Sequence, residues 1–147
     1  MKYLPLLLIL VLAFTLRAYG INWDQGHHLH PDERFLTMVT GALEFPSNIF
    51  EYFSTSTSPL NPHNKNFSFF VYGTFPIFLT KFLSEIFKLT DYNNLTLFGR
   101  FLSGVFDILV VLIVFLIGKK VFSSRVGLIA SFIYSISVLP IQLSHFY

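Results

Sequence analysis

The 147-residue sequence contains no cysteine and little charge. The absence of cysteine excludes disulfides, thiolate metal sites and a cysteine nucleophile. Charged residues make up 12% of the chain, whereas soluble globular proteins have roughly 25%. Ten Lys and Arg residues against eight Asp and Glu residues give a net charge of only +2 without a basic stripe, so nucleic acid is not an expected partner. So few charges cannot cover a soluble surface, and the composition predicts that membrane lipid covers part of it.

Apolar residues are abundant instead, at 53% of the chain with 19 phenylalanines. A helix of about 20 apolar residues crosses the hydrocarbon layer of a bilayer. Three segments meet this length: residues 1–23, Phe98–Gly118 and Val126–Tyr147. The sequence therefore predicts an all-α integral membrane protein with a first transmembrane helix at 1–23, a long loop at 24–97 and a two-span hairpin at 98–147.

The first apolar segment has two interpretations. Lys2 before the apolar run and the small residues around Tyr19 resemble a cleavable signal peptide. Arg17 next to that site argues against cleavage and favours a retained span. In such a span, we expect Arg17 to extend its side chain to the interface, with Tyr19 and Trp23 in the interfacial aromatic belt.

The basic residues predict the orientation. Lys119, Lys120 and Arg125 lie between the second and third spans, where acidic residues are absent. We expect the protein in the plasma membrane. The positive-inside rule places this turn, and with it the N-terminus, on the cytoplasmic side. The loop 24–97 is then extracytoplasmic, and its apolar segment Phe67–Leu89 lies on the outer leaflet or dips into it. A fourth full span is the alternative.

The loop carries the densest chemistry directly after the first span, in the sequence His27–Arg34. Pro31 predicts the start of a helix that places Asp32 and Glu33 in its first turn, where the helix dipole favours an ionised carboxylate. Such a carboxylate at a lipid boundary is a candidate general base, although acidic residues are also ordinary at helix starts. A metal site is a weaker alternative. An apolar face that could lie on the membrane follows in the same helix: Phe35, Met38, Val39, Ala42 and Leu43.

Asp107 is the second unusual residue, because it falls inside the second span. A charge at mid-depth in a bilayer costs about 2.5–3.5 kcal/mol on insertion scales. Arg100 lies seven residues earlier and therefore on the same helical face. Two interpretations stay open: a polar stripe that faces a substrate cavity, or a structural bond from Asp107 to a neighbouring helix.

The ordered set of motifs resembles the lipid-carrier-dependent glycosyltransferases of family 39. These include protein O-mannosyltransferases, aminoarabinose transferases of lipid A and bacterial relatives with an RgtA/B/C/D-like domain. The resemblance begins with a span followed by the Asp32-Glu33 pair. It continues through five further stretches, namely Ser68–Leu79, Gly99–Ser103, Gly118–Phe122, Val126–Ala130 and Leu139–His145.

The resemblance implies the N-terminal part of a GT-C fold, a multi-span helical bundle with amphipathic helices in its outer loop. It implies transfer of a sugar from a polyprenyl-phosphate donor to an extracytoplasmic lipid, glycan or protein, with Asp32 as the base and Glu33 beside it. Candidate contacts to the lipid phosphate or the substrate cavity are His30, Arg34, Lys65, Arg100 and Asp107. It gives no metal motif in this part of the chain and leaves metal dependence open.

The spans of this family outnumber those of the present sequence, so we expect a fragment that is inactive alone. The alternative is a non-catalytic membrane subunit whose outer loop contacts another protein. A transporter fragment is a third possibility, because Asp107 is the kind of residue that a transport path uses.

Overall fold

The computed structural model describes residues 3–147, and within these residues the only regular elements are helices. The chain forms two compact units. The first unit comprises the chain up to Trp23 together with Gly99–Tyr147, and the second comprises Asp24–Phe98.

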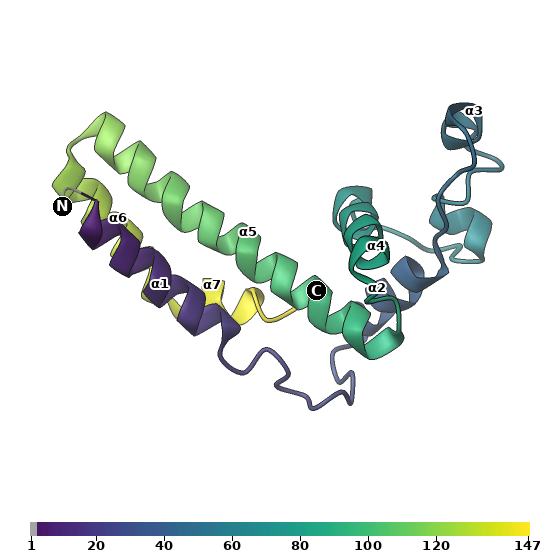
Figure 1. The fold of residues 1–147 in the computed structure, drawn as a ribbon, viewed down its shortest axis with the longest axis horizontal. Coiled ribbons are helices and arrows are strands. Elements are labelled where there is room, and N and C mark those ends of the chain that lie inside the picture. Colours follow the sequence, from purple (N-terminus) through teal and green to yellow (C-terminus); the bar gives the residue numbers. More distant parts are fainter. Residues whose placement is uncertain (1–2) are drawn as a thin grey trace. The chain divides into compact units, whose positions relative to one another are not determined.

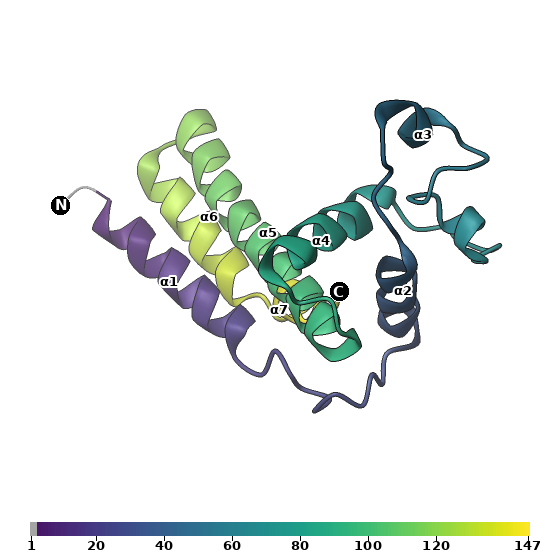
Figure 2. The same cartoon turned by 45° about the vertical axis from the view of Figure 1, so that its right-hand side comes forward.

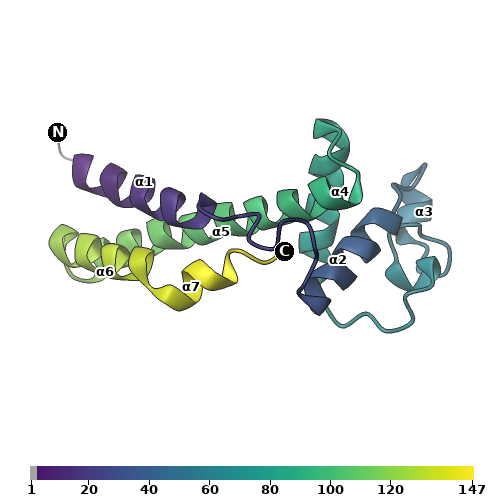
Figure 3. The same ribbon diagram turned by 90° about the horizontal axis from the view of Figure 1, so that it is seen from below.

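Three apolar helices lie side by side in the first unit: α1 (Leu4–Ala18), α6 (Ser124–Ile136) and the larger part of α5 (Tyr92–Val121) (Figures 1 and 3). Helix α5 has 30 residues, so its length is about 45 Å. Within the described part of the chain, it is the one helix that is both long and apolar enough to cross a membrane. It contains the predicted span Phe98–Gly118 and extends it at both ends.

Helix α1 is shorter than the predicted span at 1–23. It ends at Ala18, because Tyr19 adopts an extended conformation and Gly20 a left-handed one with φ +72°. Its 15 residues span about 22 Å, which is less than the roughly 30 Å of the hydrocarbon layer.

The predicted third span is also interrupted. Helix α6 ends at Ile136, and a short helix α7 (Val138–Leu143) follows after Ser137. Pro140 explains the break, since it has no N–H to bond the carbonyl of Ile136 four residues earlier and its ring clashes with that carbonyl. Pattern analysis of apolar residues cannot detect such a break, because the sequence stays apolar across it.

The second unit contains α2 (Pro31–Ala42), α3 (Ile49–Phe53), the 3-10 helix η1 (Pro62–Lys65), α4 (Thr74–Phe87) and the first turns of α5. Helices α2 and α4 pack against each other (Figure 2). Val39 and Leu43 are completely buried. The predicted membrane-facing side of α2 therefore belongs largely to the core of this unit, and only Met38 of that face is half exposed.

Helix α4 turns its polar side inward. Thr80, Lys81 and Ser84 are buried, and the Lys81 ammonium is 3.0 Å from the carboxylate of Glu85. The exposed side carries large apolar residues: Phe75, Phe82, Ile86 and Phe87. The helix has 14 residues, about 21 Å, which is too short to cross a bilayer.

Candidate functional site

The first turn of α2 forms as the sequence predicts, with Pro31 as its first residue and Asp32 and Glu33 next. His30 precedes the helix and caps it, because its Nδ1 accepts a hydrogen bond of 3.3 Å from the backbone N–H of Glu33. A ring nitrogen that accepts a hydrogen bond carries no proton, so the proton of the His30 ring is on Nε2. His30, a predicted substrate contact, therefore has a structural task at the start of the helix.

The two neighbouring carboxylates have different environments. Asp32 is exposed, whereas Glu33 is buried with 1% of its surface accessible. The hydroxyl of Tyr72 donates a hydrogen bond to Asp32, and this bond is the main reason why the pKa of Tyr72 is raised above its usual value. Of the predicted acidic pair, Asp32 alone is positioned to meet a substrate from outside.

Tyr72 is a site residue that the sequence analysis missed. It lies in the non-helical segment before α4, and its ring contacts Phe35 and Phe70 with centroid distances of 6.0 and 5.9 Å. These aromatic contacts hold the Tyr72 hydroxyl beside Asp32. No local pattern could have linked residues so far apart in the sequence.

A chain of hydrogen bonds fixes the loop that leads into α2. His28 Nε2 is 2.7 Å from Asn93 Oδ1, and His28 Nδ1 is 3.3 Å from the hydroxyl of Thr96. That hydroxyl is in turn 3.0 Å from the hydroxyl of Thr37. The His28 ring also contacts the Tyr92 ring in a tilted arrangement, with 4.4 Å between the centroids, and His28 has a left-handed backbone with φ +49°. The contacts that surround His28 compensate for this uncommon conformation.

These histidines and carboxylates do not converge on a metal site. Among residues 3–147, no three His, Asp or Glu side chains lie close enough to hold a metal ion together. His27 is exposed, while His28 and His30 bond different partners.

The basic residues predicted to hold a phosphate have different environments. Arg34 is exposed at the end of the first turn of α2. The Lys65 ammonium is 3.0 Å from the carboxylate of Glu44. Arg100 belongs to the first unit, where it is buried, donates a 2.9 Å hydrogen bond to the carbonyl of Ile21 and lies 5.2 Å from the ring centroid of Trp23. Arg34 is thus the predicted cation that stands beside Asp32 in sequence and faces outward.

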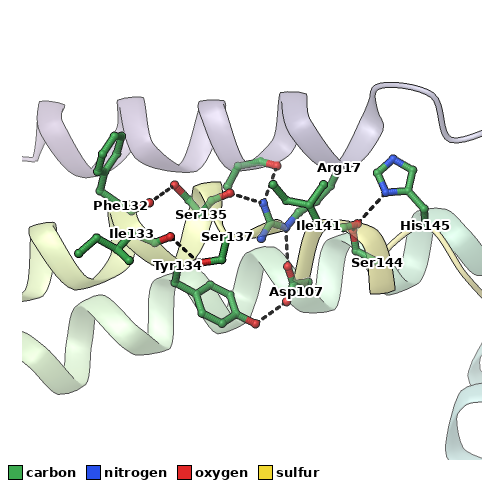
Figure 4. Close-up of polar contacts among 11 residues, drawn as sticks. Arg17, Asp107, Phe132, Ile133, Tyr134, Ser135, Ser137, Ile141, Ser144 and His145 are labelled. Atoms are coloured by element: carbon green, nitrogen blue, oxygen red, sulfur yellow. Dashed lines mark hydrogen bonds and ion pairs between the residues drawn. The ribbon is translucent and has the colours of Figure 1, made fainter. Parts of the chain in front are cut away.

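Asp107 joins three helices in the first unit (Figure 4). One of its carboxylate oxygens is 2.5 Å from Arg17 Nε of α1, and the other accepts a 2.6 Å hydrogen bond from the hydroxyl of Tyr134 of α6. Arg17 also donates to the carbonyls of Ala13 and Ser135. The structure therefore favours the second of the two interpretations of Asp107, a bond to neighbouring helices.

The expectation that Arg17 reaches the interface is wrong. Its side chain is 2% exposed, and it points between α5 and α6 (Figure 4). The carboxylate of Asp107 and the carbonyls of Ala13 and Ser135 provide a better environment for the guanidinium than lipid does.

No protein-family model matches the chain, and no curated protein or solved structure shows significant similarity to it.

Proposed function

We propose that this chain is the N-terminal part of a membrane glycosyltransferase that transfers a sugar from a polyprenyl-phosphate donor to an extracytoplasmic acceptor. The observation that carries the proposal is the arrangement of the first turn of α2, where Asp32 is exposed and hydrogen-bonded to Tyr72. An exposed, oriented carboxylate is what a general base needs, because it must reach the proton that it removes.

The reaction assigned to this site is an inverting displacement. Asp32 accepts the proton of an acceptor hydroxyl while the acceptor oxygen forms a bond to the anomeric carbon of the sugar. The bond from that carbon to the phosphate oxygen breaks, and polyprenyl phosphate leaves with the electron pair. Arg34 is the exposed cation adjacent to this turn, and its guanidinium suits the charge of the leaving phosphate.

Tyr72 positions the base. Its hydroxyl occupies one lone pair of the Asp32 carboxylate and leaves the others for the acceptor. Because the bond to Asp32 raises the pKa of Tyr72, this interaction is complete below the ordinary tyrosine pKa of about 10 and is lost as the pH rises through the raised value. The positioning is therefore intact at neutral pH.

The test is Asp32→Asn in the native protein, expressed in its source membrane. Sugar transfer is measured from a panel of radiolabelled polyprenyl-phosphate hexoses and pentoses. We expect transfer to fall by about 10² to 10⁴, the usual contribution of a general base. The pKa of Tyr72, followed by tyrosinate absorbance as the difference from Tyr72→Phe, should fall toward its usual value.

Two variants serve as controls. Glu44→Gln changes another acidic residue of the same unit, one that bonds Lys65 instead of Tyr72, and should leave transfer unchanged. Tyr72→Phe should weaken transfer less than Asp32→Asn, since the base remains. Full transfer by Asp32→Asn would contradict the assignment of Asp32 as the base. No transfer by the unsubstituted protein with any donor of the panel would contradict the enzyme proposal and favour a non-catalytic membrane subunit.

A further inference from the structure

A groove runs through the second unit between α3, η1 and the start of α4. It consists of two adjoining hollows with volumes of about 440 and 520 Å³. Both hollows are lined by Tyr52, Leu60 and Phe78, so they are direct neighbours. Their sizes lie in the range of small-molecule sites.

The two halves of the groove differ in chemistry. The first half is lined by hydrocarbon and aromatic groups: Phe45, Pro46, Phe75, Leu79 and Phe82. The second half carries hydroxyl, amide and imidazole groups: Thr55, Ser58, Asn61, His63 and Thr74. A ligand that fills both halves therefore has an apolar part and a polar part.

The absence of four charged residue types from the lining limits the class of ligand further. None of the described residues that line either hollow is Asp, Glu, Lys or Arg. A charged headgroup would find no carboxylate, ammonium or guanidinium group there, so desolvating it would be costly. Hydroxyl groups suit this lining, since the hydroxyls of Thr55, Ser58 and Thr74 can each donate and accept a hydrogen bond.

The exposed side of α4 indicates where the ligand comes from. Phe75 and Phe82 line the groove and are also 65% and 51% exposed, next to the further exposed residues Ile86 and Phe87 on the same helix. The apolar half of the groove thus continues into an apolar surface. The chain before this unit forms the apolar helix α1, and the chain after it forms the membrane-length helix α5, so both ends of the unit lead into apolar helices.

We propose that this groove binds a membrane lipid, with one hydrocarbon chain against the aromatic half and an uncharged, hydroxyl-bearing headgroup at the polar half. The polar half includes Thr74, which is two residues from Tyr72, so their Cα atoms are at most about 7 Å apart. The hydroxyl-bearing headgroup is thereby brought toward Tyr72, the partner of Asp32. If the proposed function is correct, this lipid is the sugar acceptor. Only this role as acceptor rests on the proposed function, whereas the binding of the lipid does not.

Photolabelling tests the groove directly. The native protein is placed in phosphatidylcholine vesicles that contain monoglucosyl diacylglycerol with a photoreactive acyl chain, and labelled peptides are identified by mass spectrometry. We expect saturable labelling of the groove residues. Unlabelled monoglucosyl diacylglycerol should compete, and phosphatidylglycerol should compete about tenfold less well, because its head is charged.

Two variants on α4 form a matched pair. Phe75→Gln changes a groove residue and should reduce labelling of the groove about tenfold. Phe87→Gln changes an equally exposed phenylalanine outside the lining, with 60% exposure, and should leave that labelling unchanged. Non-saturable labelling that is equal in both variants would overturn the proposal, because it would show only general contact with lipid.

The assignment of the head is tested by Thr74→Val, which removes a hydroxyl and keeps the side-chain volume. It should remove the preference for the glucosyl lipid over plain diacylglycerol while the acyl chain still binds. An unchanged preference would contradict this part of the proposal.

The proposal that the groove binds lipid and the proposal that Asp32 is the base can be disproved independently. Asp32→Asn should leave photolabelling intact while it abolishes transfer. Transfer that persists in a Phe75→Gln, Phe82→Gln double variant without labelling would disprove the groove as the acceptor site and leave Asp32 as the base.

Discussion

The short distance between Arg17 and Asp107 does not show how much this ion pair contributes to stability. Both charges are removed from water, so their attraction must first offset the cost of desolvation, and the net contribution of such a pair to stability is small. The same argument makes the loss of one partner severe. Without Asp107, an arginine that is 2% exposed would lack its counter-charge. One of its nitrogens, Nη2, already has no hydrogen-bond partner, so the loss would add to an existing cost.

At this site we predict that Asp107→Leu destabilises the first unit by about 3–5 kcal/mol. The triple variant Arg17→Met, Asp107→Leu, Tyr134→Phe should recover most of that loss, because it removes every polar member of the cluster together. Unfolding of the protein in mild detergent micelles, followed by circular dichroism, provides the measurement. A triple variant as unstable as Asp107→Leu would show that the cluster contributes more than mutual neutralisation.

Residue-level prediction from sequence succeeded where the signal is local. Pro31, Asp32 and Glu33 lie in one helical turn, and capping rules place them correctly. Partners across long separations were missed. Arg17 and Asp107 are 90 positions apart, and helical periodicity compares residues on one helix only, so it suggested Arg100 instead. The sequence thus identified Asp107 as unusual without indicating the helix that it contacts.

The hairpin of α5 and α6 depends on two glycines that face each other. A Cβ added to Gly118 would lie 2.8 Å from Gly127 Cα, and one added to Gly127 would lie 2.6 Å from the carbonyl oxygen of Phe115. These are backbone atoms, which cannot move aside without displacing a helix. Close approach through small residues is a common way for helices to associate in membranes, where the hydrophobic effect does not drive association.

We predict that Gly118→Ala destabilises this hairpin by about 1–3 kcal/mol, the usual cost of overpacking. Gly104→Ala on the same helix is the control. Its new Cβ would meet Arg17 Cβ at an ordinary 3.7 Å, and the gain in helix propensity should stabilise α5 by up to about 1 kcal/mol. Thermal unfolding of both variants in the same detergent distinguishes them. Equal stability of the two variants would contradict the close packing of the hairpin.

Helix α4 shows what pattern analysis can and cannot determine for an element. Lys81 and Glu85 are four residues apart and therefore lie on one face of the helix, but this spacing does not show which face is buried. In a soluble protein the polar face would point to water, whereas here Lys81 is buried and Phe82 is exposed. An inward polar face is understandable when the helix lies against lipid, because lipid then covers the aromatic side chains and the protein satisfies the polar ones.

At the scale of the whole molecule, the apolar segments of the sequence did not predict where the helices end. The two units of the structure separate at Trp23 and Gly99. The helix ends were misplaced where a single residue stops an apolar segment, as Pro140 does for α6. A hydropathy pattern averages over such residues, so it does not locate the end of a helix.

The proposed topology makes a prediction that the absence of cysteine renders simple to test. Any introduced cysteine is the only thiol in the chain. Phe122 lies in the turn between α5 and α6 next to Lys119 and Lys120, and Ser56 lies in an exposed turn of the second unit. If α5 crosses the membrane with its basic end in the cytoplasm, Ser56→Cys in intact cells should react with a membrane-impermeant maleimide and Phe122→Cys should react only after permeabilisation. Reaction of both cysteines in intact cells, or of neither, would place the turn and the loop on the same side. The extracytoplasmic position of Asp32 would then have to be abandoned together with the transfer reaction assigned to it.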